Sequence, residues 1–314
     1  MHGLVLGFIA SLFVLISGMK LTGFALRQHV GGVIYSSIKR KATSKRLCLL
    51  MGVLSTVILQ SSSLVTIFVV GFINGGFLSL RQGLCIVLGA NLGTTLTSQI
   101  FALDTRLFVQ PLFVLGVCMM VFEVLVKKRG GGLVLLGLAI VLGGVEMLAD
   151  ILKPLSDSVF FKELLSQSKN TPLLGMINGA LVAAILQSSS VTIGMIIVLA
   201  RNQLIQISDA VAMVLGADLG TCVTAMFASI GTLWSARCVA LGHLLFNLFS
   251  IFLVVPFWGG FLWLIELTAS ELPRQIANAH FIYNLVGVLF FIPILDKLAD
   301  ILENKGKGRK IIRT

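Results

Sequence analysis

Charged residues are scarce in this chain. Lys, Arg, Asp and Glu make up 12% of its 314 residues, against about 25% in ordinary soluble domains. Hydrophobic residues make up 57%, and the mean hydropathy is +1.01. The main polar stretches, 153–171 and 303–314, are too short to form a soluble domain. Because apolar stretches recur from end to end, the composition excludes both a soluble protein and a soluble domain on a single anchor.

Cysteine is also scarce, and catalytic patterns are absent. The five cysteines are scattered without CxxC spacing, which indicates buried thiols and excludes a disulfide framework. The sequence shows no nucleophile–base pair and no phosphate-cradling loop with its lysine, so we expect neither an enzyme nor a bound cofactor. The net charge of +11 comes from short basic clusters between apolar stretches. That pattern is typical of membrane orientation rather than nucleic-acid binding.

The apolar stretches are long enough to cross a bilayer, which takes about 20 residues. The first of them has neither a basic n-region nor a cleavage site, so it is expected to be a span and not a signal peptide. We therefore expect an all-α polytopic membrane protein. Its full-length candidate spans are residues 3–26, 83–103, 107–126, 132–152, 209–230, 237–257 and 278–296.

A polar tetrapeptide occurs twice inside apolar sequence. Gln-Ser-Ser-Ser stands at 60–63 and again at 187–190, a separation of 127 residues. The same separation relates Val-Leu-Gly-Ala-Asn-Leu-Gly-Thr at 87–94 to Val-Leu-Gly-Ala-Asp-Leu-Gly-Thr at 214–221. Two pairs of motifs at one offset indicate a duplicated unit. Polar groups placed between two repeats are typical of a carrier's substrate site.

The tetrapeptides interrupt the apolar regions 47–73 and 173–200. In the first region the arms, 47–59 and 64–73, are each too short to cross alone. The region is either one long helix with serines in its middle or a re-entrant hairpin. Basic clusters on both sides of this part of the chain, at 39–46 and 127–129, belong in the cytoplasm by the positive-inside rule. If 47–73 crossed the membrane, the two clusters would lie on opposite sides of it. If 47–73 is a hairpin, both lie on the cytoplasmic side, so the hairpin is predicted.

Placing the remaining charged residues by the same positive-inside rule predicts the topology of the whole chain. The N-terminus and 153–171 lie outside, and Arg237 and the basic tail lie in the cytoplasm of a plasma-membrane, multi-pass protein. Each repeat has three crossings and one hairpin, so the second repeat is inverted relative to the first. The stretch 258–275, with Trp258 and Trp263, suits an interfacial or short external helix. The expected organisation is repeat 1 at 1–130, inverted repeat 2 at 131–257, C-terminal interfacial and transmembrane helices at 258–302, and a cytoplasmic tail at 303–314.

The serine motifs favour anion binding. Serines at a hairpin tip are good N-caps for the second arm, and helix N-termini attract anions through free N–H groups and the helix dipole. Two opposed hairpins would bring both motifs to one small volume that suits a compact oxyanion. The predicted substrate-binding residues are Gln60, Ser61, Ser62, Ser63, Gln187, Ser188, Ser189 and Ser190.

The glycine blocks supply oxygen atoms that suit hard cations such as Na⁺. Their glycines permit either an unwound helix or a close approach of two backbones, and GxxxG spacing is also common at plain helix contacts. Asp218 stands out because an ionisable group at membrane depth is costly and usually functional. The predicted sodium-binding residues are Asn91, Thr94, Thr95, Asp218, Thr221 and Thr224.

Other polar residues in the spans have two interpretations each. Lys20 and Glu146 occupy near-equivalent places in the two repeats, and Asp150 follows one turn after Glu146. They could pair across the symmetry axis or shape the field for an anion, but snorkelling or a structural ion pair is favoured. For His243 with Asn247 and for His280 with Asn284, interhelical hydrogen bonds are favoured, because a metal site has too few ligands.

Taken together, these motifs resemble the sodium-dependent phosphate transporter family, the bacterial relatives of type II sodium/phosphate cotransporters. The resemblance rests on both motif pairs and on Ala236-Arg237-x3-Leu241-Gly242-His243-x2-Phe246-Asn247, and covers about residues 3–296. It implies sodium-coupled movement of inorganic phosphate, with the serine motifs in opposed hairpins forming the shared site. Some members carry a cytoplasmic regulatory domain after the membrane part. None follows here, so regulation through one is not expected.

The expected function is therefore Na⁺/phosphate symport by alternating access, with sodium as the co-transported ion. One alternative is a phosphate exporter or a carrier of another small oxyanion. A passive anion channel and a non-transporting membrane scaffold are alternatives of other classes. The expected partners are phosphate, sodium ions and the lipid bilayer, without nucleic acid. The sequence leaves open whether the chain forms a homo-oligomer.

Overall fold

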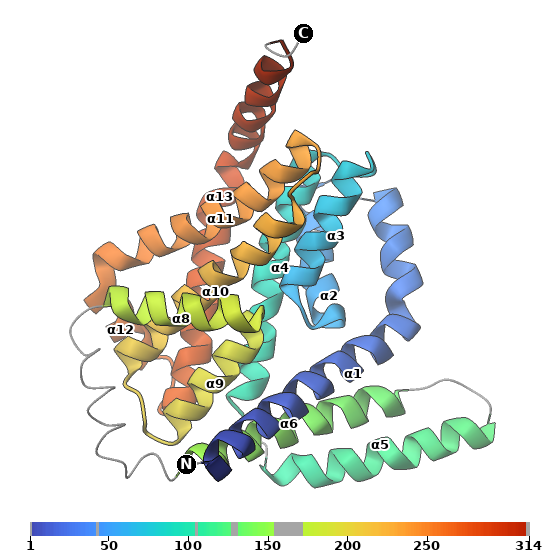
Figure 1. The fold of residues 1–314 in the computed structure, drawn as a ribbon, viewed down its shortest axis with the longest axis vertical. Coiled ribbons are helices and arrows are strands. Elements are labelled where there is room, and N and C mark those ends of the chain that lie inside the picture. The colour runs from blue at the N-terminus through green and yellow to red at the C-terminus, as the bar shows by residue number, and fades with distance from the viewer. Residues whose placement is uncertain (1, 42–43, 104–105, 127–130, 154–171, 312–314) are drawn as a thin grey trace.

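A computed structural model describes residues 2–41, 44–103, 106–126, 131–153 and 172–311. Every regular element in these ranges is a helix, and none is a strand (Figure 1). The helices are α1 (His2–Lys41), α2 (Lys45–Leu59), α3 (Ser62–Asn74), α4 (Leu80–Phe101), α5 (Arg106–Val126), α6 (Gly132–Leu152), α8 (Pro172–Leu186), α9 (Ser189–Arg201), α10 (Ile207–Ala228), α11 (Trp234–Val254), the 3₁₀ turn η2 (Val255–Phe257), α12 (Trp258–Glu266) and α13 (Leu272–Ile311).

Six segments of the described chain are long and apolar enough to cross a membrane. They are Gly3–Leu26, Leu80–Phe101, Arg106–Val126, Gly132–Leu152, Ile207–Ala228 and Trp234–Glu266. Each contains or nearly coincides with one of the spans expected from the sequence. The seventh expected span, 278–296, lies inside the longer helix α13 and is not among the six. An all-helical, polytopic membrane protein is thereby confirmed.

The helix boundaries repeat together with the motifs. Helices α2 and α8 are both 15 residues long, α3 and α9 are both 13, and α4 and α10 are both 22. In each pair the second helix begins 127 positions after the first. Helices α2 and α3 are the two arms expected around the first tetrapeptide, and α8 and α9 are their counterparts. The duplication therefore extends from the motifs to whole helices.

The glycines of the repeated blocks bring two backbones into contact. A methyl group placed on Gly89 would lie 2.0 Å from the carbonyl oxygen of Leu49, and one on Gly216 would lie 1.9 Å from that of Met176. These glycines let α4 pack against α2, and α10 against α8. Both α4 and α10 are continuous helices. Of the two roles expected for the glycines, close approach is the one observed, and unwinding is not.

The helices divide into an exposed side and a buried centre. Helices α1, α5 and α6 pack together along one side of the molecule (Figure 1), and among the described residues of α5 only Gly116 is buried. Helix α4 is largely buried and contacts α2, α3, α11 and α13. Such a helix can carry polar side chains inward without exposing them to lipid.

The residues that define orientation are less completely described. The cluster at 127–129 and the loop 154–171 lie outside the described residues, as do the last three residues of the tail. The inverted arrangement and the sidedness of the termini therefore stay predictions.

Candidate functional site

The two tetrapeptides form the same turn. Gln60 ends α2 and Gln187 ends α8, with left-handed φ values of 53° and 52°. The next residue in each case is extended, and its hydroxyl caps the following helix. Ser61 Oγ accepts a hydrogen bond from the Leu64 N–H at 3.2 Å, and Ser188 Oγ accepts one from the Val191 N–H at 3.2 Å. Each motif thus reverses the chain and starts a helix within two residues.

This turn leaves hydrogen-bond donors available. A serine that accepts a bond through an oxygen lone pair keeps its own O–H for another partner. The first N–H groups of a helix have no acceptor within that helix, and the cap occupies only one of them. The positive end of the helix dipole lies at the same place. Each tip therefore presents O–H and N–H donors and partial positive charge.

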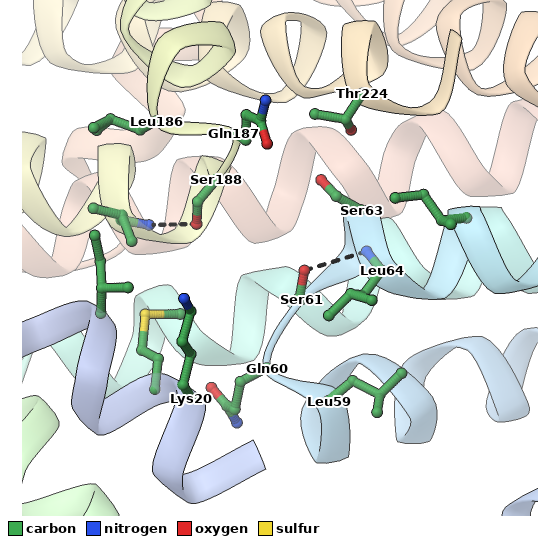
Figure 2. Close-up of a pocket in the computed structure, with 14 residues that line it drawn as sticks. Lys20, Leu59, Gln60, Ser61, Ser63, Leu64, Leu186, Gln187, Ser188 and Thr224 are labelled. Carbon is green, nitrogen blue, oxygen red and sulfur yellow. Dashed lines mark hydrogen bonds between the residues drawn. The ribbon is translucent and has the colours of Figure 1, made fainter. Parts of the chain in front are cut away.

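Both tips open into one cavity of about 460 Å³. Figure 2 shows Ser61 and Ser188 on two facing turns, one from each repeat, with Lys20 of α1 beside them. Thr224 of α10 closes another part of the wall. No acidic side chain is among the cavity-lining residues that the structure describes. The polar residues of the lining are Lys20, Gln60, Ser61, Ser63, Gln187, Ser188 and Thr224.

Five of the eight predicted substrate residues line this cavity. The others, Ser62, Ser189 and Ser190, are buried in the first turns of α3 and α9 and do not line it. Lys20 was not among the predicted substrate residues. From the sequence it could shape the field for an anion, but snorkelling or a structural ion pair was favoured. The packing of α1 against the tips could not be read from the sequence.

A second polar cluster lies in the buried centre. Asn91 Nδ2 donates to Asn247 Oδ1 at 2.7 Å, and His243 Nε2 lies 2.9 Å from Asn91 Oδ1. The Asn247 amide also donates to the backbone carbonyl of Asp218 at 3.3 Å. This chain of bonds links α4, α11 and α10. It joins the two residues, Asn91 and Asp218, that stand at equivalent positions in the repeated blocks.

The Asp218 carboxylate is held by α13. Its Oδ2 accepts a hydrogen bond from the Tyr283 hydroxyl and one from Asn284 Nδ2 at 2.9 Å, and it lies 3.2 Å from His280 Nε2. The other nitrogen of His280 lies 2.9 Å from Ser98 Oγ. All of these side chains are buried. The interhelical hydrogen bonds expected of both His/Asn pairs are confirmed.

The predicted sodium residues do not share one wall in this structure. Thr224 lines the cavity, whereas Asn91 and Asp218 lie in the buried cluster. The hydroxyls of Thr94, Thr95, Thr221 and Thr224 donate to carbonyls of their own helices. One buried oxygen beside Asp218, Asn284 Oδ1, has no hydrogen-bond partner among the described residues. Oxygen ligands are thus present near Asp218, and the sodium assignment stays a prediction.

Glu146 pairs with arginines and not with Lys20. Its carboxylate lies 2.7 Å from Arg201 Nη1 and 2.9 Å from Arg106 Nε. Arg106 also lies 3.5 Å from Asp150, and Arg201 donates to the carbonyl oxygens of Phe101 and Leu103. Glu146 is therefore part of a structural ion-pair cluster joining α5, α6 and α9.

Comparison with known proteins places these features in a family. The Na⁺/Pi-cotransporter family matches the chain twice, over residues 14–150 and 142–291. An uncharacterized protein of Bacillus subtilis, YqeW, is 27% identical over 93% of this chain and 95% of its own length. The putative inorganic phosphate export protein YjbB of Escherichia coli K12 is 27% identical over 94% of this chain.

The similarity to other relatives is partial. This chain covers 54% of the length of YjbB. The human sodium-dependent phosphate transport protein 2B is 36% identical over 101 residues, which are 32% of this chain and 14% of that protein. No solved structure matches the chain. The double match of the family over most of the sequence is nevertheless decisive: the chain belongs to the Na⁺/Pi-cotransporter family.

Proposed function

We propose that the chain transports inorganic phosphate together with Na⁺ by alternating access. The observation that carries this proposal is one cavity lined by residues of both Gln-Ser-Ser-Ser turns, one turn from each repeat. A site built from two repeats is the usual arrangement in secondary carriers, because movement of one repeat against the other changes the side to which the site opens.

The chemistry of the cavity suits phosphate. Phosphate is a compact anion with several acceptor oxygens, and the tips offer hydroxyl and backbone N–H donors from two helix N-termini. The amides of Gln60 and Gln187 add further donors. The lining contains no carboxylate that would repel an anion, within the described part of the chain.

Sodium is assigned to the oxygen-rich glycine blocks. The proposed ligands are drawn from Asn91, Thr94, Thr95, Asp218, Thr221 and Thr224, and the family and the name of protein 2B support coupling to Na⁺. Binding there would require the threonine hydroxyls or the Asp218 carboxylate to exchange their present partners. Sodium is the transported ion in this proposal, and no cofactor or catalytic step is involved.

Outward transport of phosphate is a second candidate. It is favoured by the relative YjbB, which is named a putative phosphate export protein and matches nearly the whole of this chain. The cavity itself is compatible with flux in either direction.

Flux measurements on the purified protein in liposomes distinguish sodium-coupled transport from the alternatives. Liposomes carrying the purified chain should take up ³²P-phosphate when Na⁺ is higher outside, with saturation at high phosphate, and should not do so under an equal K⁺ gradient. Counterflow with phosphate, arsenate and sulfate measures selectivity. Saturable phosphate flux without sodium dependence would leave a uniporter or exporter, and flux without saturation would indicate a channel. Absence of any phosphate flux would overturn the proposal.

A further inference from the structure

Lys20 is the one charged side chain among the cavity-lining residues that the structure describes. It comes from α1, outside the repeated hairpins, and lies between the turn at Gln60 and the turn at Gln187. In Figure 2 its amine extends into the space between the two turns. Met19 and Ile16 of the same helix line the cavity next to it.

Among the described residues, no acidic side chain forms an ion pair with the Lys20 amine. The acid at the near-equivalent position of the second repeat, Glu146, is held by Arg106 and Arg201 instead. The other polar residues of the lining are uncharged, so the cavity carries a net positive charge of one from its side chains.

Snorkelling to the membrane surface is the ordinary explanation for a lysine in an apolar helix. Here the amine points toward the serine turns, and the other polar side chains that line the cavity are uncharged. A cation in a membrane segment is costly unless it faces a cavity or a counter-charge. Lys20 is exposed and lines the cavity, where an anionic ligand would supply its counter-charge.

We propose that Lys20 is a substrate-binding residue that supplies the fixed positive charge of the anion site. The inference rests on the proposed function and adds one charged residue to its phosphate site. The serines and helix N-termini fit the oxygens of the substrate, and Lys20 balances part of its charge. Because that charge is built into the protein, less of it has to be supplied by bound Na⁺.

The charge of Lys20 should determine how strongly phosphate binding depends on sodium. A fixed positive charge that lines the cavity attracts an anion bound there, and the attraction is stronger where the bound substrate displaces water. With Lys20 present, phosphate retains measurable binding at low sodium. Without it, the anion binds only when sodium ions supply the missing charge. Loss of Lys20 should therefore weaken phosphate binding and make it more sodium-dependent, while turnover at saturating phosphate changes much less.

The test compares three variants in the intact protein. Lys20→Gln removes the charge, Lys20→Arg keeps it, and Lys297→Gln removes a charge from an exposed position on α13 that does not line the cavity. Binding of ³²P-phosphate to purified protein is measured across a range of Na⁺ concentrations, and uptake into liposomes gives KM and kcat separately.

Lys20→Gln should raise the phosphate Kd and KM by about tenfold or more, with the largest effect at low sodium. Lys20→Arg should stay within about threefold of the parent protein, and Lys297→Gln should match it. An unchanged KM in correctly folded Lys20→Gln would overturn the inference while leaving the transport proposal intact. Lack of phosphate binding or transport by the parent protein would instead overturn the proposed function itself.

Discussion

Gln60 and Gln187 adopt the same left-handed backbone conformation, with φ of 53° and 52°, and both line the cavity between the two repeats. Left-handed geometry is unfavourable for a residue with a β-carbon and is usually left to glycine. Here a glutamine occupies it twice. Gln203, which does not line the cavity, has a similar φ of 56°, so substitutions are needed to test a role of the two cavity glutamines in transport.

Replacing either glutamine by glycine should impair phosphate transport without destabilising the protein. In Gln60→Gly the gain from relaxed backbone strain, about 1 kcal/mol, is offset by loss of the 2.6 Å bond from Gln60 Nε2 to the Val57 carbonyl, worth about 1 kcal/mol. The melting temperature in detergent should change little, whereas the phosphate KM should rise several-fold. Gln187 makes no corresponding side-chain bond among the described residues, so Gln187→Gly should be stabilised by about 1 kcal/mol while the phosphate KM rises in the same way.

A β-branched residue at the same site is the matched control. Gln60→Val removes the amide and also strains the left-handed turn, so it should lower the free energy of unfolding by about 2 kcal/mol. If Gln60→Gly transports phosphate with an unchanged KM, the amide has no part in substrate binding.

Contacts between the helix pairs should depend on glycine at specific positions. A methyl group on Gly216 would lie 1.9 Å from the Met176 carbonyl oxygen, whereas none of the surrounding atoms lies within 4 Å of one on Gly71. Gly216→Ala should destabilise the protein by about 2 kcal/mol or more, because α8 and α10 must separate. Gly71→Ala should be neutral or stabilising by up to about 1 kcal/mol.

Thermal unfolding of the two variants in the same detergent checks this comparison. Equal melting temperatures for Gly216→Ala and Gly71→Ala would contradict the close packing of α8 against α10.

The Asp218–His280 contact should behave as a buried ion pair. Ser98 Oγ donates to the Thr95 carbonyl at 2.6 Å, so it is placed to accept from His280 Nδ1, and His280 Nε2 faces the Asp218 carboxylate. Both ring nitrogens of His280 therefore face oxygen atoms of buried side chains. Removing either partner leaves the other charge buried, at a cost of about 3–5 kcal/mol.

A double-mutant cycle measures this directly. Asp218→Asn and His280→Gln should each lower stability strongly, and the double variant should be more stable than the sum of the single effects predicts. Strict additivity of the two effects would show that the residues are not coupled. Sodium titrations on Asp218→Asn test the proposed sodium role at the same time, since loss of a ligand should weaken sodium activation.

Much of this architecture could be predicted from the sequence, because apolar length and internal repetition are local signals. The arms around Gln60 and Gln187 were predictable, since a helix of 15 or 13 residues is too short to cross a membrane. The partners of Asp218 were not. His280, Tyr283 and Asn284 lie more than 60 residues away in sequence, and only the packing of α13 against α10 brings them together.

The residues that line the cavity were likewise only partly predictable, because they come from helices that are distant in sequence. Capping by Ser61 and Ser188 follows from their place before a helix, but the presence of Lys20 beside them depends on how α1 lies against both tips. Likewise, the glycine blocks were compatible with unwound helices or with close contact. Only the facing carbonyls of Leu49 and Met176 decide between these alternatives.

Transport as proposed requires the two turns to form one phosphate site. Ser61→Ala and Ser188→Ala test it, with Ser79→Ala as control, because Ser79 caps α4 through the same kind of bond to Gln82 N–H but does not line the cavity. Each of the three changes should cost about 1 kcal/mol of stability through loss of a cap. A difference in phosphate binding between them therefore reports contact with substrate.

The most direct measurement is equilibrium binding of ³²P-phosphate to the purified protein, with stoichiometry and Kd determined for all three variants. One phosphate should bind per chain. Either Ser61→Ala or Ser188→Ala should raise the Kd about tenfold or more, and Ser79→Ala should leave it unchanged. Two phosphates per chain, or loss of affinity in only one of the two cavity variants, would contradict a single site shared by both repeats.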